Sequence, residues 1–239
     1  MSHSAVVPVP KLEKDFYDWW ARHKVKCAEA AAGNHALVFI GDSITHLYEG
    51  YPAGGIPRGE AVWQEYYARR RALNLGYGWD RTQNVLWRLD HGEFAGQTPR
   101  LVVLLIGTNN LTGSNNAPAN TPAEIADGIE AVCGRIRKLS PTTRILLMGL
   151  LPRGAYPADP LRAPIRELNA RLAEWAASQP LLEFADIGRL FLEADGTLPP
   201  RLMNDGVHPT DPGYRIWADA IEPHIQKWIG GGEGTRRPT

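Results

Sequence analysis

Short, continuous apolar runs that alternate with helical patterns constrain the fold of this chain more than any other feature. Unbroken apolar character over a few residues is typical of strands that are buried on both faces of a parallel sheet. Five such runs occur, at 36–40, 72–75, 101–106, 145–151 and, more weakly, 181–185. Helical patterns lie between and after them, at 82–91, 122–139, 161–178 and 212–228.

This alternation predicts a three-layer α/β/α sandwich. A strand, a helix and a second parallel strand connect through a right-handed crossover, which places the helices over the faces of the sheet. In open sheets of this kind, ligands bind beyond the carboxyl ends of the strands. The residues that directly follow each apolar run are therefore the candidates for chemistry.

The 239 residues contain no internal repeat and no long linker, so we expect one main domain over 36–229. Before it, residues 1–35 form an arm and a helical segment that packs on the body. Within 11–32, Phe16, Trp19, Trp20, His23 and Cys27 recur at intervals of three and four, which predicts an amphipathic helix. The Gly-rich, polar segment 230–239 is expected to be a flexible tail.

The composition argues against several classes of function. Lys plus Arg and Asp plus Glu each number 26, so the formal net charge is +0 and we expect no nucleic-acid partner. No apolar run approaches the roughly 18 residues of a membrane span. The first ten residues lack the basic start and apolar stretch of a signal peptide, so we expect a cytoplasmic protein.

The cysteines and histidines give no support for a metal site. Cys27 and Cys133 are the only cysteines, too few for a structural zinc site or a disulfide framework. Cys133 falls in step with the apolar residues of 122–139 and is expected in the core, and Cys27 is interpreted as structural. No histidine pair has HExxH spacing, so no metal is expected.

The first apolar run ends in Gly41, Asp42 and Ser43, before a predicted helix start. A serine at a helix N-terminus is exposed, and unsatisfied amides favour an anion developing there. Serine is equally common there as a helix cap. This motif alone supports a nucleophilic role and a helix-capping role for Ser43 equally.

The second and third runs end in possible oxyanion donors. Gly76 follows the second run and offers an amide that a ligand could approach, although glycine after a strand is often only a turn residue. Asn109 follows the third run, and its carboxamide could donate to an oxyanion or bond its own backbone in a turn.

A candidate acid and base stand before the last predicted helix. Asp205 precedes His208 by three residues, close enough for the carboxylate to bond Nδ1 and leave Nε2 free to accept a proton from a serine. His46, three residues after Ser43, is the rival base. Together the four segments would supply a nucleophile, a base, an orienting acid and oxyanion donors at one edge of the sheet.

In order, the chain carries VFIGDSIT, ALNLGYG, IGTNN and DGVHPT. These four blocks, within 36–221, resemble those of the SGNH hydrolases, also called GDSL esterases. The segments NVLWRLDHGE, IGTNN and GLLPRG are similar to those of catalytic subunits of intracellular type I platelet-activating factor acetylhydrolases. The resemblance implies a flavodoxin-like, five-stranded parallel sheet with strand order 2-1-3-4-5. It also implies hydrolysis of a small acyl ester without a metal or other cofactor.

Carried over to this chain, the family pattern makes Ser43 the nucleophile, His208 the base and Asp205 its orienting partner. The Ser43 amide, the Gly76 amide and the Asn109 side chain would form the oxyanion hole. The residues expected to line the substrate pocket are Asp42, Tyr77, Trp79 and Asn110.

The chain departs from the family pattern at Asn110, where many members have Asp, although acetylhydrolase-like members share the Asn. It also departs at Trp79, where the acetylhydrolases have a small residue. The loops 50–59 and 111–121 look longer than in the acetylhydrolases and are expected to wall the cleft or to reach a neighbour's cleft. Tyr77 and Trp79 could stack on a sugar, although core packing is an equal alternative for both.

The expected activity is a serine esterase that removes a short acyl group, acetyl above all, from a sugar or a lipid-like alcohol. Two alternatives stay open: an acyltransferase with the same triad, and a non-catalytic binding protein on the same fold. The resemblance to the acetylhydrolases also implies a homodimer.

Overall fold

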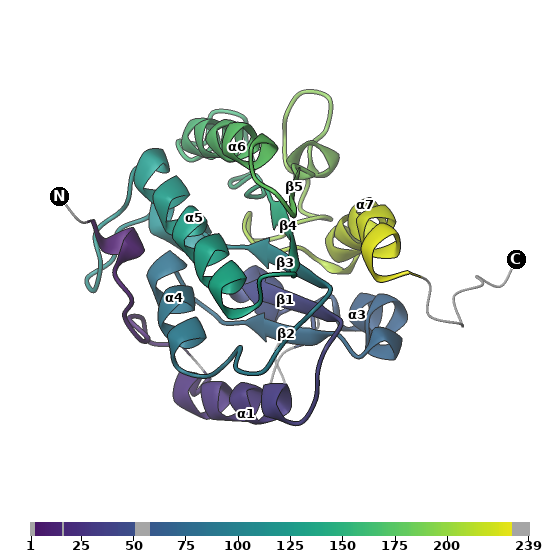
Figure 1. The fold of residues 1–239 in the computed structure, drawn as a ribbon. Coiled ribbons are helices and arrows are strands. Elements are labelled where there is room, and N and C mark those ends of the chain that lie inside the picture. The colour runs from purple at the N-terminus through teal and green to yellow at the C-terminus, as the bar shows by residue number, and fades with distance from the viewer. Residues whose placement is uncertain (1–2, 16, 51–57, 231–239) are drawn as a thin grey trace, which may run out of the picture.

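The computed structural model describes residues 3–15, 17–50 and 58–230. Its centre is a five-stranded, all-parallel sheet in the order β2-β1-β3-β4-β5, which confirms the predicted fold class (Figure 1). The strands are β1 Leu37–Gly41, β2 Leu73–Gly76, β3 Leu101–Leu105, β4 Arg144–Met148 and β5 Leu182–Ala185. Each begins or ends within a few residues of the apolar run that predicted it.

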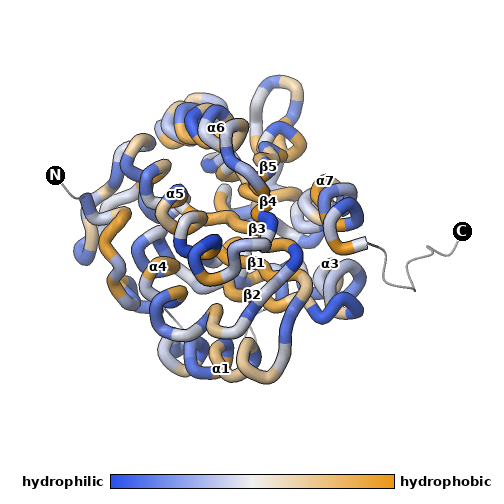
Figure 2. Tube along the Cα trace, viewed as in Figure 1, coloured by the Kyte–Doolittle hydropathy of each residue, from blue (hydrophilic) through white to orange (hydrophobic). Residues whose placement is uncertain are grey.

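Helices cover both faces of the sheet, as the alternation predicted. One face carries α4 Thr82–Asp90, α5 Pro122–Leu139 and α6 Arg162–Ala177, and the other carries α3 Glu60–Tyr66 and α7 Asp211–Ile229. Each face has its own buried apolar cluster. Figure 2 shows the resulting pattern, with apolar strands in the centre and polar outer faces on the helices. Cys133 is fully buried in the first cluster, as its spacing predicted.

Local signals explain where the helices begin. At α5, Thr121 and Glu124 form a reciprocal capping box and Pro122 occupies the first turn, so this helix has the predicted bounds. The N-terminal helix, α1 Trp19–Ala31, begins later than expected because the Asp18 side chain caps it by accepting the amides of Trp20 and Ala21.

Described residues of the arm before α1 pack on the body without forming part of that helix. Phe16, which the sequence pattern placed on the helix, and the predicted tail beyond 230 lie outside the described residues. Ala5, in the short 3-10 helix Ser4–Val6, is fully buried. Its carbonyl accepts the hydroxyl of Thr82 at 2.8 Å, and the Asn84 side chain donates to the carbonyl of Pro10 at 2.7 Å. The N-terminal arm is therefore hydrogen-bonded to the start of α4.

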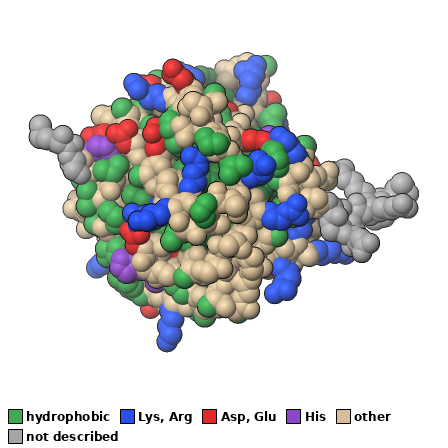
Figure 3. Space-filling model, in the orientation of Figure 1, with side chains coloured by type: hydrophobic (Ala, Val, Ile, Leu, Met, Phe, Trp, Pro, Cys, Tyr) green, Lys and Arg blue, Asp and Glu red, His purple; other side chains and the backbone are tan. Residues whose placement is uncertain are grey.

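The remaining elements lie at turns. They are α2 Ser43–His46 and the 3-10 helices Ala68–Arg70, Thr108–Leu111 and Gly188–Phe191. Among the described helices, none is long and apolar enough to cross a membrane. Lys and Arg side chains are scattered over the face shown in Figure 3 and alternate with acidic and apolar ones.

Candidate active site

Ser43 lies at the carboxyl end of β1, where a tight turn leads into α2. The turn needs glycine at position 41, because a Cβ there would lie 2.4 Å from the carbonyl oxygen of Leu105. Asp42, and not Ser43, caps α2: its Oδ1 accepts the amide of Ile44 at 2.9 Å. The capping role that could have explained Ser43 is thus taken by its neighbour. The Ser43 side chain is left partly exposed at the first helical position.

The loop before α7 brings a histidine to this serine. His208 Nε2 lies 2.9 Å from Ser43 Oγ, and His208 Nδ1 lies 2.8 Å from Asp205 Oδ2. Asp205 Oδ1 also accepts the amides of Val207 and His208, at 2.9 and 2.8 Å. Burial alone would raise the pKa of Asp205, but the bonds from the His208 ring and these amides hold it well below its usual range.

This geometry fixes the direction of proton transfer. An ionised Asp205 can only accept, so His208 carries its hydrogen on Nδ1 and presents Nε2 as an acceptor to the Ser43 hydroxyl. Both distances lie within the reach expected for a nucleophile, a base and an orienting acid. The structure therefore brings Ser43, His208 and Asp205 into one hydrogen-bonded chain.

The rival base, His46, points into the protein. It is buried, and its Nδ1 accepts the amide of Gly78 at 3.3 Å. Burial, with the nearby cations of Arg22 and Lys26, lowers the pKa of His46 to about 2. His46 supports the loop that follows β2, whereas Ser43 is hydrogen-bonded to His208.

Arg58 was missed by the sequence reasoning. Its Nη2 donates to Asp205 Oδ2 at 3.1 Å, and its Nη1 donates to the carbonyl of His208 at 2.8 Å. Arg58 therefore bonds both ends of the segment 205–208, which we call the acid-base loop. It follows the segment 51–57, which lies outside the described residues, so the predicted role of the loop 50–59 as a cleft wall stays a prediction.

Asn109 lies in the turn after β3, the strand that pairs with β1 in the sheet. Its Nδ2 donates one hydrogen to the carbonyl of Asp80 at 2.9 Å, which leaves the second hydrogen of the amide for another acceptor. Asp80 is itself fixed, because Trp19 Nε1 and Arg88 Nε donate to its carboxylate at 2.8 and 2.7 Å. Burial nevertheless raises the pKa of Asp80 to about 6.

Gly76 does not offer a free amide. Its N–H donates to Asn74 Oδ1 at 2.8 Å, and a Cβ at this position would lie 2.3 Å from the backbone nitrogen of His46. The glycine is required for close packing of β2 against α2. This arrangement disagrees with the expected role of the Gly76 amide in an oxyanion hole.

Three of the four residues expected to line a pocket are buried. Asp42 is 1% exposed, and burial raises the pKa of its carboxyl to about 7. Tyr77 is fully buried with Arg88 over its ring, 4.0 Å from the centroid, which supports the core-packing alternative. Asn110 is fully buried, where it accepts the amide of Thr82 at 3.0 Å. These positions disagree with direct contact between a substrate and Asp42, Tyr77 or Asn110.

Trp79 is the exception, since this residue is 51% exposed. Its backbone has φ +62°, a left-handed conformation that is strained for a bulky residue. The second long loop, 111–121, is tied to α4 by Arg81, whose guanidinium donates to the carbonyls of Thr112 and Pro118 at 3.0 Å. A role for this loop as a cleft wall stays a prediction.

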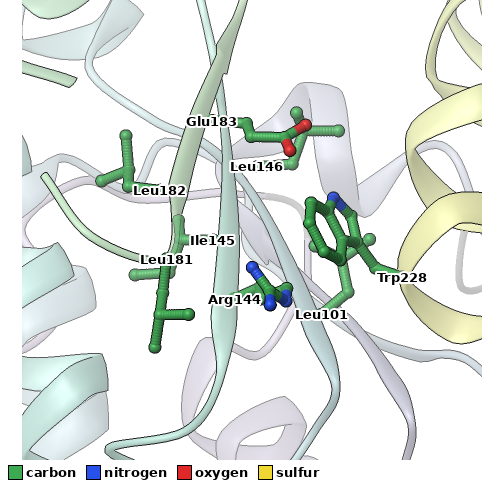
Figure 4. Close-up of a pocket in the computed structure, with 8 residues that line it drawn as sticks. All are labelled: Leu101, Arg144, Ile145, Leu146, Leu181, Leu182, Glu183 and Trp228. Carbon is green, nitrogen blue, oxygen red and sulfur yellow. The ribbon is translucent and has the colours of Figure 1, made fainter. Parts of the chain in front are cut away.

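No group of three or more His, Cys, Asp or Glu side chains among the described residues could hold a metal ion. A small hollow lies between β3, β4, β5 and the end of α7, with Arg144, Glu183 and Trp228 in its lining (Figure 4). It adjoins the amino ends of these strands, at the edge of the sheet opposite Ser43.

A family model described as the GDSL-like lipase/acylhydrolase family matches residues 39–216. The chain belongs to this family. It is 32% identical over 235 residues to the rat platelet-activating factor acetylhydrolase IB subunit alpha1, covering 98% of this chain and 94% of the rat protein. It is also 32% identical over 219 residues to the chicken alpha2 subunit, covering 90% and 88%.

Solved structures agree on the fold of this GDSL-family protein. A GDSL-like lipase from Bacteroides thetaiotaomicron superposes with a TM-score of 0.69 at 22% identity, covering 87% of this chain and 98% of that one. Family membership and these relatives make the protein a carboxylic ester hydrolase.

Proposed function

We propose that this protein is a serine esterase that removes a short acyl group, acetyl above all, from the oxygen of a sugar or lipid-like alcohol. The observation that carries the proposal is the continuous chain from Ser43 Oγ through the His208 ring to Asp205 Oδ2, with links of 2.9 and 2.8 Å. The similarity to the rat relative, which is a platelet-activating factor acetylhydrolase subunit, supports acetyl as the acyl group.

In the proposed mechanism, Ser43 attacks the ester carbonyl while His208 Nε2 takes the hydroxyl proton. Asp205 holds the ring in the required tautomer and stabilises the imidazolium that forms. His208 then gives the proton to the departing alcohol oxygen, which leaves an acyl group on Ser43. A water molecule, deprotonated by the same ring, releases the acid and restores the serine. These steps need no cofactor, because side chains carry out each proton and acyl transfer.

The oxyanion needs donors near Ser43. The free hydrogen of Asn109 Nδ2 and the Ser43 amide at the start of α2 are two of them. For a third we infer the amide of Trp79. Of the five consecutive amides from 76 to 80, those of 76, 77, 78 and 80 donate to groups of the chain. The amide of Trp79 has no acceptor among the described residues, and its unusual backbone angle fits a functional turn.

Hydrolysis of 4-nitrophenyl acetate, butyrate and hexanoate, alongside acetylated sugars, tests this proposal. The expected result is turnover that is fastest with acetyl and falls by several powers of ten in Ser43→Ala. An alcohol acceptor such as glycerol, added to the same assay, separates hydrolysis from acyl transfer. Release of acetate without acetylated glycerol supports the esterase. No ester turnover by the wild type would reject the proposal.

A further inference from the structure

Arg153 places a cation beside the proposed catalytic residues. It follows β4 in the segment GLLPRG, and its side chain is partly exposed. Its Nη1 donates to the carbonyl of Thr108 at 3.2 Å, and Thr108 is the residue before Asn109. The guanidinium therefore lies against the turn that carries the Asn109 carboxamide.

The backbone of Arg153 is fixed from two sides. Arg162 Nε donates to the Arg153 carbonyl at 2.6 Å, and Arg162 Nη2 donates to the Gly154 carbonyl at 2.9 Å. The Gly154 amide donates to the carbonyl of Gly206 at 3.0 Å, inside the loop that carries Asp205 and His208. The Arg153 segment thus connects the acid-base loop to the turn that carries Thr108 and Asn109.

Most N–H groups of the Arg153 guanidinium have no acceptor among the described residues. Among the described residues, no carboxylate lies within 4.0 Å of it, and only Nη1 has a hydrogen-bond acceptor in the chain. The other two arginines near the site already have acceptors. Arg58 donates to Asp205 and to the His208 carbonyl, and Arg162 donates to the carbonyls of Arg153 and Gly154.

A partly buried cation without a direct ion-pair partner is costly. Burial lowers the pKa of Arg153, and the charges of Asp42, Asp159 and Asp205, which form no ion pair with it, oppose this shift only in part. A planar guanidinium with a free edge matches a carboxylate or phosphate, which it can bind through two parallel hydrogen bonds. Because the Arg153 segment is bonded to the loop of His208, which protonates the departing alcohol in the proposed mechanism, such an anion would belong to the alcohol half of the ester.

We propose that Arg153 is a specificity-determining residue that binds an anionic group, a carboxylate or a phosphate, on the alcohol half of the substrate. This inference rests on the proposed esterase function. It predicts that the preferred substrate is an acyl ester of an acidic alcohol, such as a uronate-type sugar or a phosphorylated alcohol, in place of a neutral one.

The test compares acetyl esters of phenols with and without an anionic substituent on the ring. Phenyl acetate is the neutral ester, and 3-acetoxybenzoate and 3-acetoxyphenyl phosphate carry the two anions. Arg153→Gln should lower kcat/KM for the anionic ester that fits by about 10- to 100-fold, because hydrogen bonds to charged groups contribute that much. Phenyl acetate should change less than threefold. Arg153→Lys should recover part of the loss, and Arg171→Gln, on the exposed face of α6, should change neither rate.

The controls separate the possible failures. Equal loss with neutral and anionic esters would make Arg153 a support for Thr108 and overturn the proposal. A wild type that shows no preference for either anion would also overturn it. If no ester is hydrolysed, the esterase proposal fails, and calorimetric titration with 3-hydroxybenzoate and 3-hydroxyphenyl phosphate still tests the site. Wild-type binding of one anion that is lost in Arg153→Gln supports the site, and unchanged or absent binding rejects it.

Discussion

Replacing Asn109 with alanine separates catalysis from stability in this site. Its Nδ2 donates one hydrogen to the Asp80 carbonyl at 2.9 Å and has a second free for an oxyanion. Loss of one oxyanion donor typically lowers kcat by about 10²- to 10³-fold, which corresponds to about 2.7 to 4 kcal/mol. Because the donor acts on charge that develops in the transition state, KM should change little.

The same substitution also removes the partner of the Asp80 carbonyl. Asp80 is 2% exposed, so water reaches its carbonyl poorly in the folded protein. The free energy of unfolding should therefore fall by about 1 to 3 kcal/mol, the cost of an unpaired buried polar group. Denaturant titration measures this loss, and steady-state kinetics with 4-nitrophenyl acetate, well below the unfolding midpoint, measure the catalytic loss.

Asn110→Ala is the matched control. Asn110 is also buried and bonds Thr82, Gln83 and Asn120, but it serves only the protein interior. Asn110→Ala should lower the free energy of unfolding at least as much as Asn109→Ala does, and its kcat should stay within threefold of the wild-type value. Equal kcat losses in both variants would refute the oxyanion role of Asn109. So would a raised KM with unchanged kcat in Asn109→Ala.

Three further predictions follow from the same site. Asp205→Asn should lower kcat by about 10⁴-fold because the His208 ring loses its orienting carboxylate. Arg58→Ala only loosens that carboxylate and should lower kcat by about 10- to 100-fold. Steady-state kinetics compare the two losses, and an equal or larger loss in Arg58→Ala contradicts these roles. Burial raises the pKa of Asp42 from 3.8 to about 7, so its folded form keeps a proton that the unfolded chain loses, and stability falls as pH rises from 4 to 7. That loss is at most about 4 kcal/mol; denaturant titrations should show a flatter pH dependence for Asp42→Asn, and an unchanged slope refutes the assignment. Trp79→Gly keeps the backbone amide and relieves the φ of +62°, so turnover of acetyl esters should persist. If the bulky ring lines the pocket and narrows its acyl side, hexanoyl esters should improve in a chain-length series. Loss of acetyl turnover would contradict the view that only the amide of Trp79 takes part in catalysis, and unchanged hexanoyl turnover would contradict a role of the ring in acyl selection.

The sheet could be predicted from sequence because its strands are buried on both faces and read as unbroken apolar runs. The edge strand β5 is buried mainly at Leu182, which explains why its run was the weakest. The short α3 was not predicted, since its seven residues are too few to show a helical period clearly. Ser43, His208 and Asp205 could be selected because each follows or precedes a recognisable element.

What sequence could not supply was the use of individual hydrogen bonds. Gly76 looked like a free amide, but Asn74 two residues earlier takes it. The bond from Arg58 to the His208 carbonyl spans 150 residues, and no local pattern predicts such a contact. The N–H groups of Arg153 that lack an acceptor could not be predicted from the sequence for the same reason. The homodimer implied by family resemblance stays a prediction.

Covalent labelling tests the central claim, that Ser43 is the nucleophile activated by His208, most directly. An organophosphonate inhibitor should add one equivalent to the wild type, abolish ester hydrolysis in proportion, and map by peptide mass spectrometry to Ser43 alone. His208→Ala should slow the labelling by several powers of ten, because the hydroxyl loses its base. Label on another residue, or near-normal hydrolysis by unlabelled Ser43→Ala, would contradict the account.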